Sequence, residues 1–261
     1  MNFSIQRPAV IRGAKNVFRA PIPMAMTPCR NARRTIHQSS AHPSSSIQAQ
    51  AQPTTSATGR RFYQQPSYMP ERPRRVVIGI TGATGTAYAI RLLVILRELG
   101  VETHLVISKW ALATLKYETS LSEPEIRGLA NSTYTAKDMS AAIASGSFQH
   151  DGMLVVPCSM KTLAAVRSGF CDDLISRAAD VSLKEGRRLV LVVRETPLSD
   201  VHLDNMLFLR RAGAVIFPPV PAFYTRPASL DDMVNQTAGR ILDSMGMHIN
   251  GFERWDGFRK L

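Results

Sequence analysis

Acidic residues are absent from the first 70 positions of the sequence, which contain nine lysines and arginines and no aspartate or glutamate. The whole chain of 261 residues has a formal net charge of +12, but positions 71–261 hold 23 basic and 20 acidic residues, a net charge of +3. The positive charge therefore belongs to the N-terminal segment. A nucleic-acid-binding domain carries its excess charge on its folded part, so the composition predicts no nucleic-acid partner.

Cysteines and long apolar runs are also scarce. The chain has three cysteines (Cys29, Cys158 and Cys171), with no C-x-x-C pair and no His/Cys cluster at zinc-binding spacing. This argues against a disulfide framework and against a structural metal, and we expect no metal in the site. No apolar run approaches the roughly 18 residues that a membrane-spanning helix needs, so we also expect no membrane span.

The N-terminal segment is instead rich in arginine and serine. Such an acid-free composition is typical of a mitochondrial transit peptide. Residues 39–67 have too few large apolar side chains to offset the entropy of ordering them. We therefore predict that residues 1–70 are a transit peptide with a disordered linker, and that the protein is mitochondrial. The alternative is a disordered basic tail on a cytosolic protein.

Short apolar segments alternate with amphipathic ones from residue 72 to about residue 245. Strands are predicted at 75–80, 102–107, 153–157, 188–193 and 214–217. Helices are predicted at 86–99, 109–117, after the capping box Ser122–Glu125, and at 138–144, 160–167, 172–185, 200–211 and 230–245. This pattern predicts one α/β domain over residues 72–245, a doubly wound parallel sheet of the flavodoxin/Rossmann-like, three-layer kind. Ligands of such sheets bind at the carboxyl ends of the strands.

The first predicted strand ends in a glycine turn, Thr81–Gly85, which opens directly into a helix. Backbone N–H groups at such a turn, together with the helix dipole, can hold a phosphate. Ile80 stands where a dinucleotide fingerprint has glycine, and the second strand ends at Ser108 rather than at an acidic residue for a ribose. We therefore expect a mononucleotide such as FMN. A tight turn without a ligand is the alternative.

Polar groups also follow two of the later strands. Ser159, Lys161 and Thr162 begin a helix after the third strand and suit an anion, although a hydroxyl at this position is also an ordinary N-cap. Arg194 and Glu195 directly follow the fourth strand. Glu195 is expected to be an acid/base group whose pKa is tuned by its charged neighbours, with a structural ion pair as the alternative.

Further cations lie on the predicted helices. Arg177, Asp180 and Lys184 share one helix face, so the two cations either bind a phosphate or form part of a solvated surface. Lys184 is also a candidate neighbour of Glu195. Near the C-terminus, Phe223-Tyr224 can form the wall of a pocket or pack in the core, and Arg240 can reach inward or face water.

Residues 75–245 resemble the UbiX-type flavin prenyltransferases, a family that includes fungal mitochondrial phenylacrylic acid decarboxylase-like proteins. The matching stretches are GITGATGTAYAIRLL, ETHLVISKWA, SGSF, VVPCSMKTLA, LISRAADVSLKEGRRLVLVVRETPL and GAVIFPPVPAFYTRPASLDDMVNQTAGRILD. The resemblance implies transfer of a dimethylallyl group from dimethylallyl phosphate to N5 and then C6 of reduced FMN, without a metal. A UbiD-type decarboxylase would receive the prenylated FMN.

The resemblance also implies a role for individual residues. The residues that would bind FMN are Gly82, Ala83, Thr84, Ser108, Ser159, Met160, Lys161, Thr162 and Arg194. The residues that would hold the prenyl phosphate are Lys184, Tyr224 and Arg240, with Arg177 nearby. Glu195 would act as acid and base, and Glu118 would be a second carboxylate that reaches the site.

Relatives of this kind form large homo-oligomers, dodecamers among them, with sites at subunit interfaces. The tail, residues 246–261, is a candidate contact with a neighbouring copy. Two other functions remain open from the sequence: an FMN-dependent decarboxylase that acts directly on phenylacrylic or hydroxybenzoic acids, and a non-enzymatic flavin-binding regulatory module.

Overall fold

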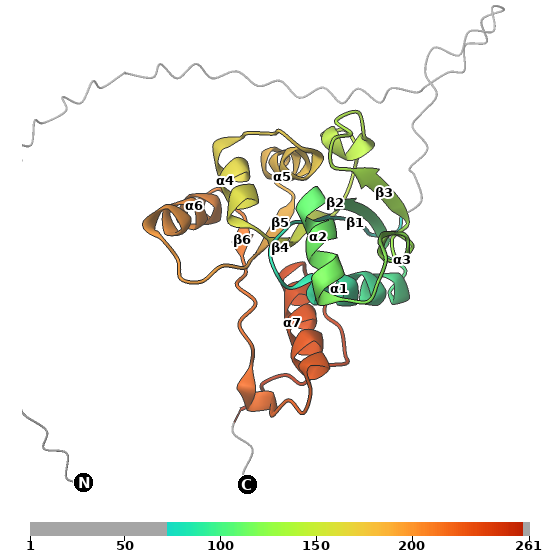
Figure 1. Cartoon of the computed structure of the whole chain (residues 1–261), viewed down its shortest axis with the longest axis vertical. Coiled ribbons are helices and arrows are strands. Elements are labelled where there is room, and N and C mark those ends of the chain that lie inside the picture. The colour runs from blue at the N-terminus through green and yellow to red at the C-terminus, as the bar shows by residue number, and fades with distance from the viewer. Residues whose placement is uncertain (1–71, 258–261) are drawn as a thin grey trace, which may run out of the picture. The chain divides into compact units, whose positions relative to one another are not determined.

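Six strands form one sheet in which every neighbouring pair is parallel, in the order β3-β2-β1-β4-β5-β6 (Figure 1). The strands are Arg75–Ile80 (β1), Glu102–Ile107 (β2), Ser132–Thr135 (β3), Gly152–Cys158 (β4), Arg188–Val193 (β5) and Val215–Ile216 (β6). The structure is a computed structural model that describes residues 72–257. The predicted transit peptide and linker, residues 1–70, and the end of the tail lie outside the described residues.

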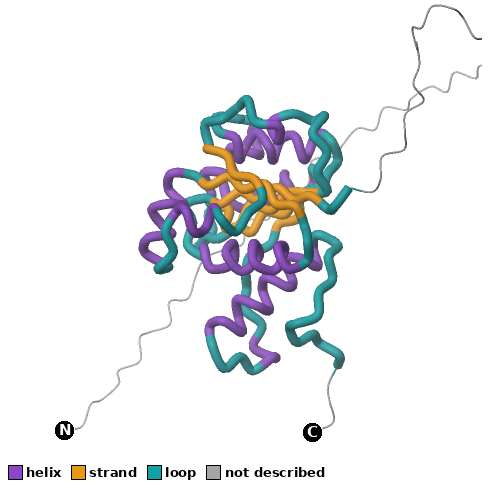
Figure 2. Tube along the Cα trace, turned by 90° about the vertical axis from the view of Figure 1, so that its right-hand side faces the viewer, coloured by secondary structure: helices purple, strands orange, loops and turns teal. Residues whose placement is uncertain are grey.

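Helices connect the strands and cover both faces of the sheet (Figure 2). They are Thr86–Glu98 (α1), Lys109–Glu118 (α2), Glu123–Arg127 (α3), Met160–Ser168 (α4), Leu174–Lys184 (α5), Asp200–Arg211 (α6) and Leu230–Ser244 (α7), with 3-10 turns at Ala142–Ala144 (η1) and Phe223–Thr225 (η2). The predicted doubly wound parallel sheet is therefore confirmed. None of the helices in residues 72–257 is long and apolar enough to cross a bilayer.

Alternate strand residues supply two separate cores, because successive side chains of a strand point to opposite faces. In β1, Val76, Ile78 and Ile80 pack in a cluster with α1, α2, α3 and α7. Val77 packs in the other cluster, with α4, α5, α6 and η1. The nearly continuous burial of β1, β2, β4 and β5 explains why these strands could be read from the sequence as apolar runs.

Two predictions between β2 and β4 were wrong. Ser132–Thr135 is a strand that was not predicted, because its alternating exposure and polar Ser-Thr-Tyr-Thr sequence carry no apolar run. The helix predicted over 138–144 is reduced to the 3-10 turn Ala142–Ala144. Asp138 explains the loss, since its carboxylate accepts hydrogen bonds from the backbone N–H and the hydroxyl of Ser140 and so stabilises a turn.

The order in which strands are added to the sheet reverses between β1 and β4. β2 and β3 lie on one side of β1, whereas β5 and β6 lie beyond β4 on the other side. Connections leave such neighbouring strands toward opposite faces, which opens a crevice at their carboxyl ends. The Thr81–Gly85 turn and the segment that begins at Ser159 border this crevice.

Candidate functional site

A buried hydroxyl joins the two sides of the crevice between β1 and β4. Thr81, only 2% exposed, donates from its Oγ1 to the carbonyl of Pro157 over 2.7 Å. The same oxygen accepts from the backbone N–H of Ser159 over 2.8 Å. The loops after β1 and β4 are therefore fixed relative to one another before any ligand binds.

Backbone donors without a partner in the described chain line both loops. The N–H groups of Gly82, Ala83 and Thr84 make no hydrogen bond among residues 72–257. At the start of α4, the N–H groups of Met160 and Lys161 are two of the donors that a helix N-terminus leaves unpaired. Five N–H groups from two loops therefore converge on one crevice, which suits the phosphate predicted there.

Three hydroxyls near the crevice lie at the N-termini of α2 and α4, and two of them cap these helices. Ser108 accepts from the N–H of Ala111 and caps α2, and Ser159 accepts from the N–H of Thr162 and caps α4. The Thr162 hydroxyl lies 3.2 Å from that of Ser159. The N-cap alternative is thus correct for Ser159, and the Ser108 cap was not predicted, but an accepting hydroxyl keeps its proton and can still donate to a ligand. Lys161 is exposed and lies 3.4 Å from Asp172.

Gly82 lies against the first turn of α2. A Cβ on Gly82 would stand 2.5 Å from Cβ of Trp110, whose side chain is 71% exposed. Gly85 is required for a different reason, since its φ of 108° is in the left-handed region. Trp110 was not among the predicted site residues. Its position directly after the second predicted strand was the signal that could have identified it.

Glu118 changes the expected use of the α1 N-terminus. Its carboxylate accepts from the N–H of Thr86 over 2.8 Å and from that of Gly85 over 3.0 Å and 3.1 Å. Burial opposes ionisation of Glu118, but hydrogen bonds from Thr84, Thr86 and Gly85 outweigh it and lower its pKa. The first two donors of α1 therefore bind this carboxylate, and the donors left for a ligand lie further into the turn.

Arg194 and Glu195 extend from the carboxyl end of β5 into solvent. The N–H of Arg194 donates to the carbonyl of Cys158, which places it beside the end of β4. Its guanidinium has no partner among the described residues. Glu195 accepts only from the N–H of Thr196, at 3.0 Å, so the alternative of a structural Arg194–Glu195 ion pair is wrong for the described chain.

Lys184 lies near the amino end of β5, whereas Glu195 lies at its carboxyl end. Lys184 ends α5, four residues before β5 begins, whereas Glu195 follows the end of β5. The six residues of that strand span about 20 Å. The expectation that Lys184 stands beside Glu195 is therefore wrong within one chain. Lys184 pairs with Glu185 instead.

Arg177 shares the face of α5 that carries Lys184, as the spacing predicted. Its Nη1 donates to Asp180 over 2.9 Å and its Nε to the carbonyl of Ala144 over 3.0 Å. Arg177 therefore contacts the last residue of η1, and Lys184 lies against Gly146, two residues further along the chain.

Tyr224 and Arg240 line a second cavity of about 530 Å³ under the β6–α7 connection. Trp255 of the tail meets Tyr224 edge to face, with ring centroids 5.4 Å apart. Arg254 lines the same cavity. The crevice residues are not part of its wall, so one chain holds the predicted site residues in three separate groups.

Asp243 organises the cations of this second cavity. It accepts from Arg240 over 2.8 Å, and from Arg254 over 2.7 Å and 2.8 Å. The Arg254 hydrogen bonds outweigh burial and, with those of His248 and Arg240, hold the pKa of Asp243 far below its usual range. Asp243 was not predicted, although its i,i+3 spacing from Arg240 on α7 was a signal that could have identified it. The pairing of Arg254 with Asp243 could not be read from the sequence, because the fold is needed to bring the tail back onto α7.

Comparisons with known proteins agree with this architecture. The Flavoprotein family model matches residues 64–242. Flavin prenyltransferase PAD1, mitochondrial, of Saccharomyces cerevisiae is 64% identical over 193 residues, which are 74% of this chain and 80% of that protein.

Two crystal structures are also similar. AnUbiX (PadA1), in complex with FMN and dimethylallyl pyrophosphate, has a TM-score of 0.71 and 60% identity and covers 72% of this chain and 100% of its own. The dodecameric FMN-dependent UbiX-like decarboxylase of Escherichia coli O157:H7 has a TM-score of 0.69 and 51% identity, with coverages of 70% and 100%. The described residues contain no cluster of three side chains that could hold a metal ion.

Proposed function

The chain belongs to the family of UbiX-like flavin prenyltransferases, and we propose that it transfers a dimethylallyl group from dimethylallyl phosphate to N5 and C6 of reduced FMN. The observation that carries the proposal is the set of unpaired backbone N–H donors at the carboxyl ends of β1 and β4, where the strand order of the sheet reverses. A UbiD-type decarboxylase is the proposed recipient of the prenylated FMN.

The crevice fits the phosphate of FMN. The N–H groups of Gly82, Ala83, Thr84, Met160 and Lys161 are unpaired among the described residues and supply directional donors for phosphate oxygens. The hydroxyls of Ser108, Ser159 and Thr162 add donors at the same edge. Arg194 supplies a guanidinium that no described carboxylate neutralises. Reduced FMN, when bound there, supplies the two ring atoms that receive the prenyl group.

The protein's own side chains must neutralise the departing phosphate. As the carbon–oxygen bond of the prenyl phosphate breaks, negative charge grows on the phosphate, and preorganised cations lower the barrier. We assign this role to Lys184 and Arg240, with Arg177 nearby, and we assign to the Tyr224 hydroxyl a hydrogen bond to the same phosphate. Glu195 is assigned two proton transfers: its carboxyl would donate to the leaving phosphate, and the resulting carboxylate would accept the proton that C6 loses. The proton that N5 loses would go to the prenyl double bond, which then forms the bond to C6. Its exposed position at the strand end supports access to both.

Lys184 must reach the site from another copy of the chain. Within one chain it is separated from Glu195 by the length of β5, about 20 Å. A homo-oligomer resolves this separation, because a neighbour can place its α5 against the crevice. The dodecameric relative supports a large homo-oligomer, and we propose that the tail, residues 246–261, contributes to the contacts between copies.

Glu118 is proposed to act indirectly. It binds the N–H groups of Gly85 and Thr86 and so shapes the turn whose remaining donors face FMN. This arrangement supports a role in holding the acceptor rather than in proton transfer.

One assay distinguishes the prenyltransferase from a decarboxylase, an alternative favoured by the decarboxylase activity ascribed to the Escherichia coli relative. Purified protein is incubated without oxygen with reduced FMN and dimethylallyl phosphate, and separately with FMN and cinnamic acid. The flavin is extracted for mass spectrometry and CO₂ is measured. We expect FMN heavier by one dimethylallyl group and no CO₂. Unchanged FMN together with CO₂ release would reject the proposal.

A variant separates the enzyme from a flavin-binding regulatory module. Glu195→Gln should keep the fold and FMN binding but lose on the order of 10²-fold in turnover, as expected when an acid/base group is removed. The matched control is Glu98→Gln, at the exposed end of α1. Equal activity of the two variants would argue against proton transfer by Glu195.

We also propose that residues 1–70 direct the chain to mitochondria. The acid-free, basic composition of this segment supports this, as does the mitochondrial yeast relative. Fusion of residues 1–70 to a fluorescent protein should give a mitochondrial signal, and a diffuse cytosolic signal would contradict it.

A further inference from the structure

The segment Ala144–Gln149 has little hydrogen bonding of its own. Its internal backbone bond joins the N–H of Phe148 to the carbonyl of Ser145 over 3.3 Å. Four of its carbonyls instead accept from arginine side chains. Arg177 donates to Ala144 over 3.0 Å, and Arg75 donates to Gln149 over 3.0 Å.

Arg187 makes the two central bonds. Its Nη2 donates to the carbonyl of Gly146 over 2.6 Å and its Nη1 to that of Phe148 over 2.8 Å. No carboxylate pairs with Arg187 in the described residues. Both hydrogen bonds of the guanidinium therefore go to the loop, and its fork geometry fixes two carbonyls at once.

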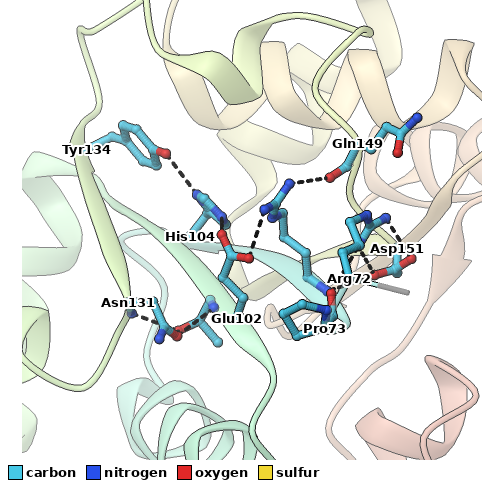
Figure 3. Close-up of polar contacts among 10 residues, drawn as sticks. Arg72, Pro73, Glu102, His104, Asn131, Tyr134, Gln149 and Asp151 are labelled. Carbon is cyan, nitrogen blue, oxygen red and sulfur yellow. Dashed lines mark hydrogen bonds and ion pairs between the residues drawn. The ribbon is translucent and has the colours of Figure 1, made fainter. Parts of the chain in front are cut away.

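Arg75 is held in place from the other side. Its Nη2 donates to Glu102 over 2.8 Å, and its guanidinium lies 4.7 Å from the centroid of the Phe148 ring. Glu102 also forms a hydrogen bond with Nε2 of His104, and Nδ1 of His104 forms one with the hydroxyl of Tyr134, each over 2.8 Å (Figure 3). The loop is therefore anchored to the first residues of β1 and β2 and to β3.

Gly146 lies directly beneath the end of α5. A Cβ at this position would stand 2.7 Å from Nζ of Lys184 and 2.1 Å from Oε1 of Glu185. The Lys184–Glu185 pair therefore rests on the bare backbone of Gly146. A lysine side chain that is 46% exposed would otherwise sample many rotamers, and this contact restricts them.

We propose that Arg187 is a positioning residue for Lys184: it fixes the Gly146 backbone as the seat on which the Lys184 ammonium is presented to the prenyl phosphate of a neighbouring copy. The inference rests on the proposed function, which assigns Lys184 to that phosphate. Arg177 and Arg75 hold the two ends of the same loop. A displaced loop moves the ammonium, and small displacements of a binding group are costly in affinity and rate.

The test measures the affinity for dimethylallyl phosphate by calorimetry, with enzyme that carries oxidised FMN so that no reaction occurs. Arg187→Ala should weaken binding on the order of tenfold while FMN affinity stays unchanged. Arg187→Lys, which can satisfy one carbonyl at a time, should fall between. The control is Arg97→Ala, whose guanidinium makes one 3.4 Å contact with a carbonyl at the end of α3.

A double-mutant cycle shows whether Arg187 acts through Lys184. In a Lys184→Ala background, Arg187→Ala should cause no further loss, since there is no ammonium left to position. Equal losses in the two backgrounds, or no loss in either, would overturn the proposal. If wild-type enzyme makes no prenylated FMN in the anaerobic assay, the proposed function fails instead, and the two failures are distinguishable.

Gly146→Ala tests the contact between Gly146 and Lys184 while leaving every arginine in place, in case Arg187→Ala does not fold. Its Cβ would push the Lys184 ammonium away, so the affinity for dimethylallyl phosphate should fall while FMN binding is retained. Gly128→Ala is the matched control, because the contacts of its Cβ begin at 3.3 Å. Equal affinities for these two glycine variants would also overturn the proposal.

Discussion

The side-chain oxygen of Thr81 accepts a hydrogen bond from the backbone N–H of Ser159 over 2.8 Å. Seventy-eight residues separate the two in the chain, yet this contact joins the loops after β1 and β4, where the donors of the crevice lie. The hydroxyl also donates to the carbonyl of Pro157, and the Thr81 N–H donates to the same carbonyl over 3.3 Å, so Thr81 links both halves of the proposed phosphate site.

Thr81→Val should therefore impair both stability and FMN binding. The substitution keeps the shape of the side chain but leaves the partly buried Ser159 N–H without its acceptor, at a cost of about 1 kcal/mol. FMN affinity should fall as well, since the two loops are no longer fixed. Urea unfolding and flavin titration measure the two effects. Thr114→Val is the control: this half-buried threonine of α2 bonds the carbonyl of Trp110 in its own helix, and its substitution should change stability by less than about 0.5 kcal/mol. Matching results for the two variants would contradict this role of Thr81.

Glu118→Gln should lower stability in a pH-dependent manner. The charged carboxylate interacts favourably with the α1 N-terminus, an effect of about 0.3–1 kcal/mol for such a site. The folded-state pKa of Glu118 is lowered, so its contribution is complete above the ordinary glutamate pKa and is lost as pH falls through the folded-state value. Wild type should melt at a higher temperature than the variant at neutral pH, and this difference should disappear in acid. A difference that is independent of pH would count against the electrostatic explanation.

His150 should make the fold sensitive to mild acid. Its side chain is 4% exposed, Nδ1 lies 3.1 Å from the carbonyl of Gly152, and Nε2 is buried without a partner in the described residues. Burial, helped by the charge of Arg187, lowers the pKa of His150 to about 4. The unfolded chain takes up this proton near pH 6.5, so stability is complete above that pH and declines as pH falls toward the folded-state value.

His150→Asn keeps an N–H for the Gly152 carbonyl and removes the titration. Between about pH 7.5 and about pH 5, wild type should lose about 2 kcal/mol more stability than the variant. His104, whose pKa is also lowered by burial, titrates in both proteins and cancels. Urea unfolding of both proteins at the two pH values measures the difference, and an equal loss would show that His150 does not control acid sensitivity.

The sequence predicted the strands that are buried on both faces and the crevice that they position. β1, β2 and β5 have the predicted bounds because continuous apolar runs specify buried parallel strands. β3 was missed because it is short, polar and at the edge of the sheet. Its identity as a strand depends on its pairing with β2, which no local pattern records.

Motifs identified residues of the site, but the sequence did not predict where these residues lie relative to one another. Motif and resemblance selected Lys184 and Glu195 together, but chain order puts them at opposite ends of β5. The capping of α1 by Glu118 and the pairing of Arg254 with Asp243 depend on contacts between segments that no local spacing links. Side chains that meet only through tertiary folding, or through a second copy, leave no spacing signal in one sequence.

The most direct test of a site shared between copies is a mixed oligomer of two inactive variants. Lys184→Ala and Glu195→Gln chains with different tags are co-expressed, purified through both tags, and assayed without oxygen for prenylated FMN. If the two residues come from different copies, about one site in four regains both, and activity returns. Activity no higher than that of either variant alone would show that Lys184 and Glu195 act within one chain, and would contradict a site shared between copies.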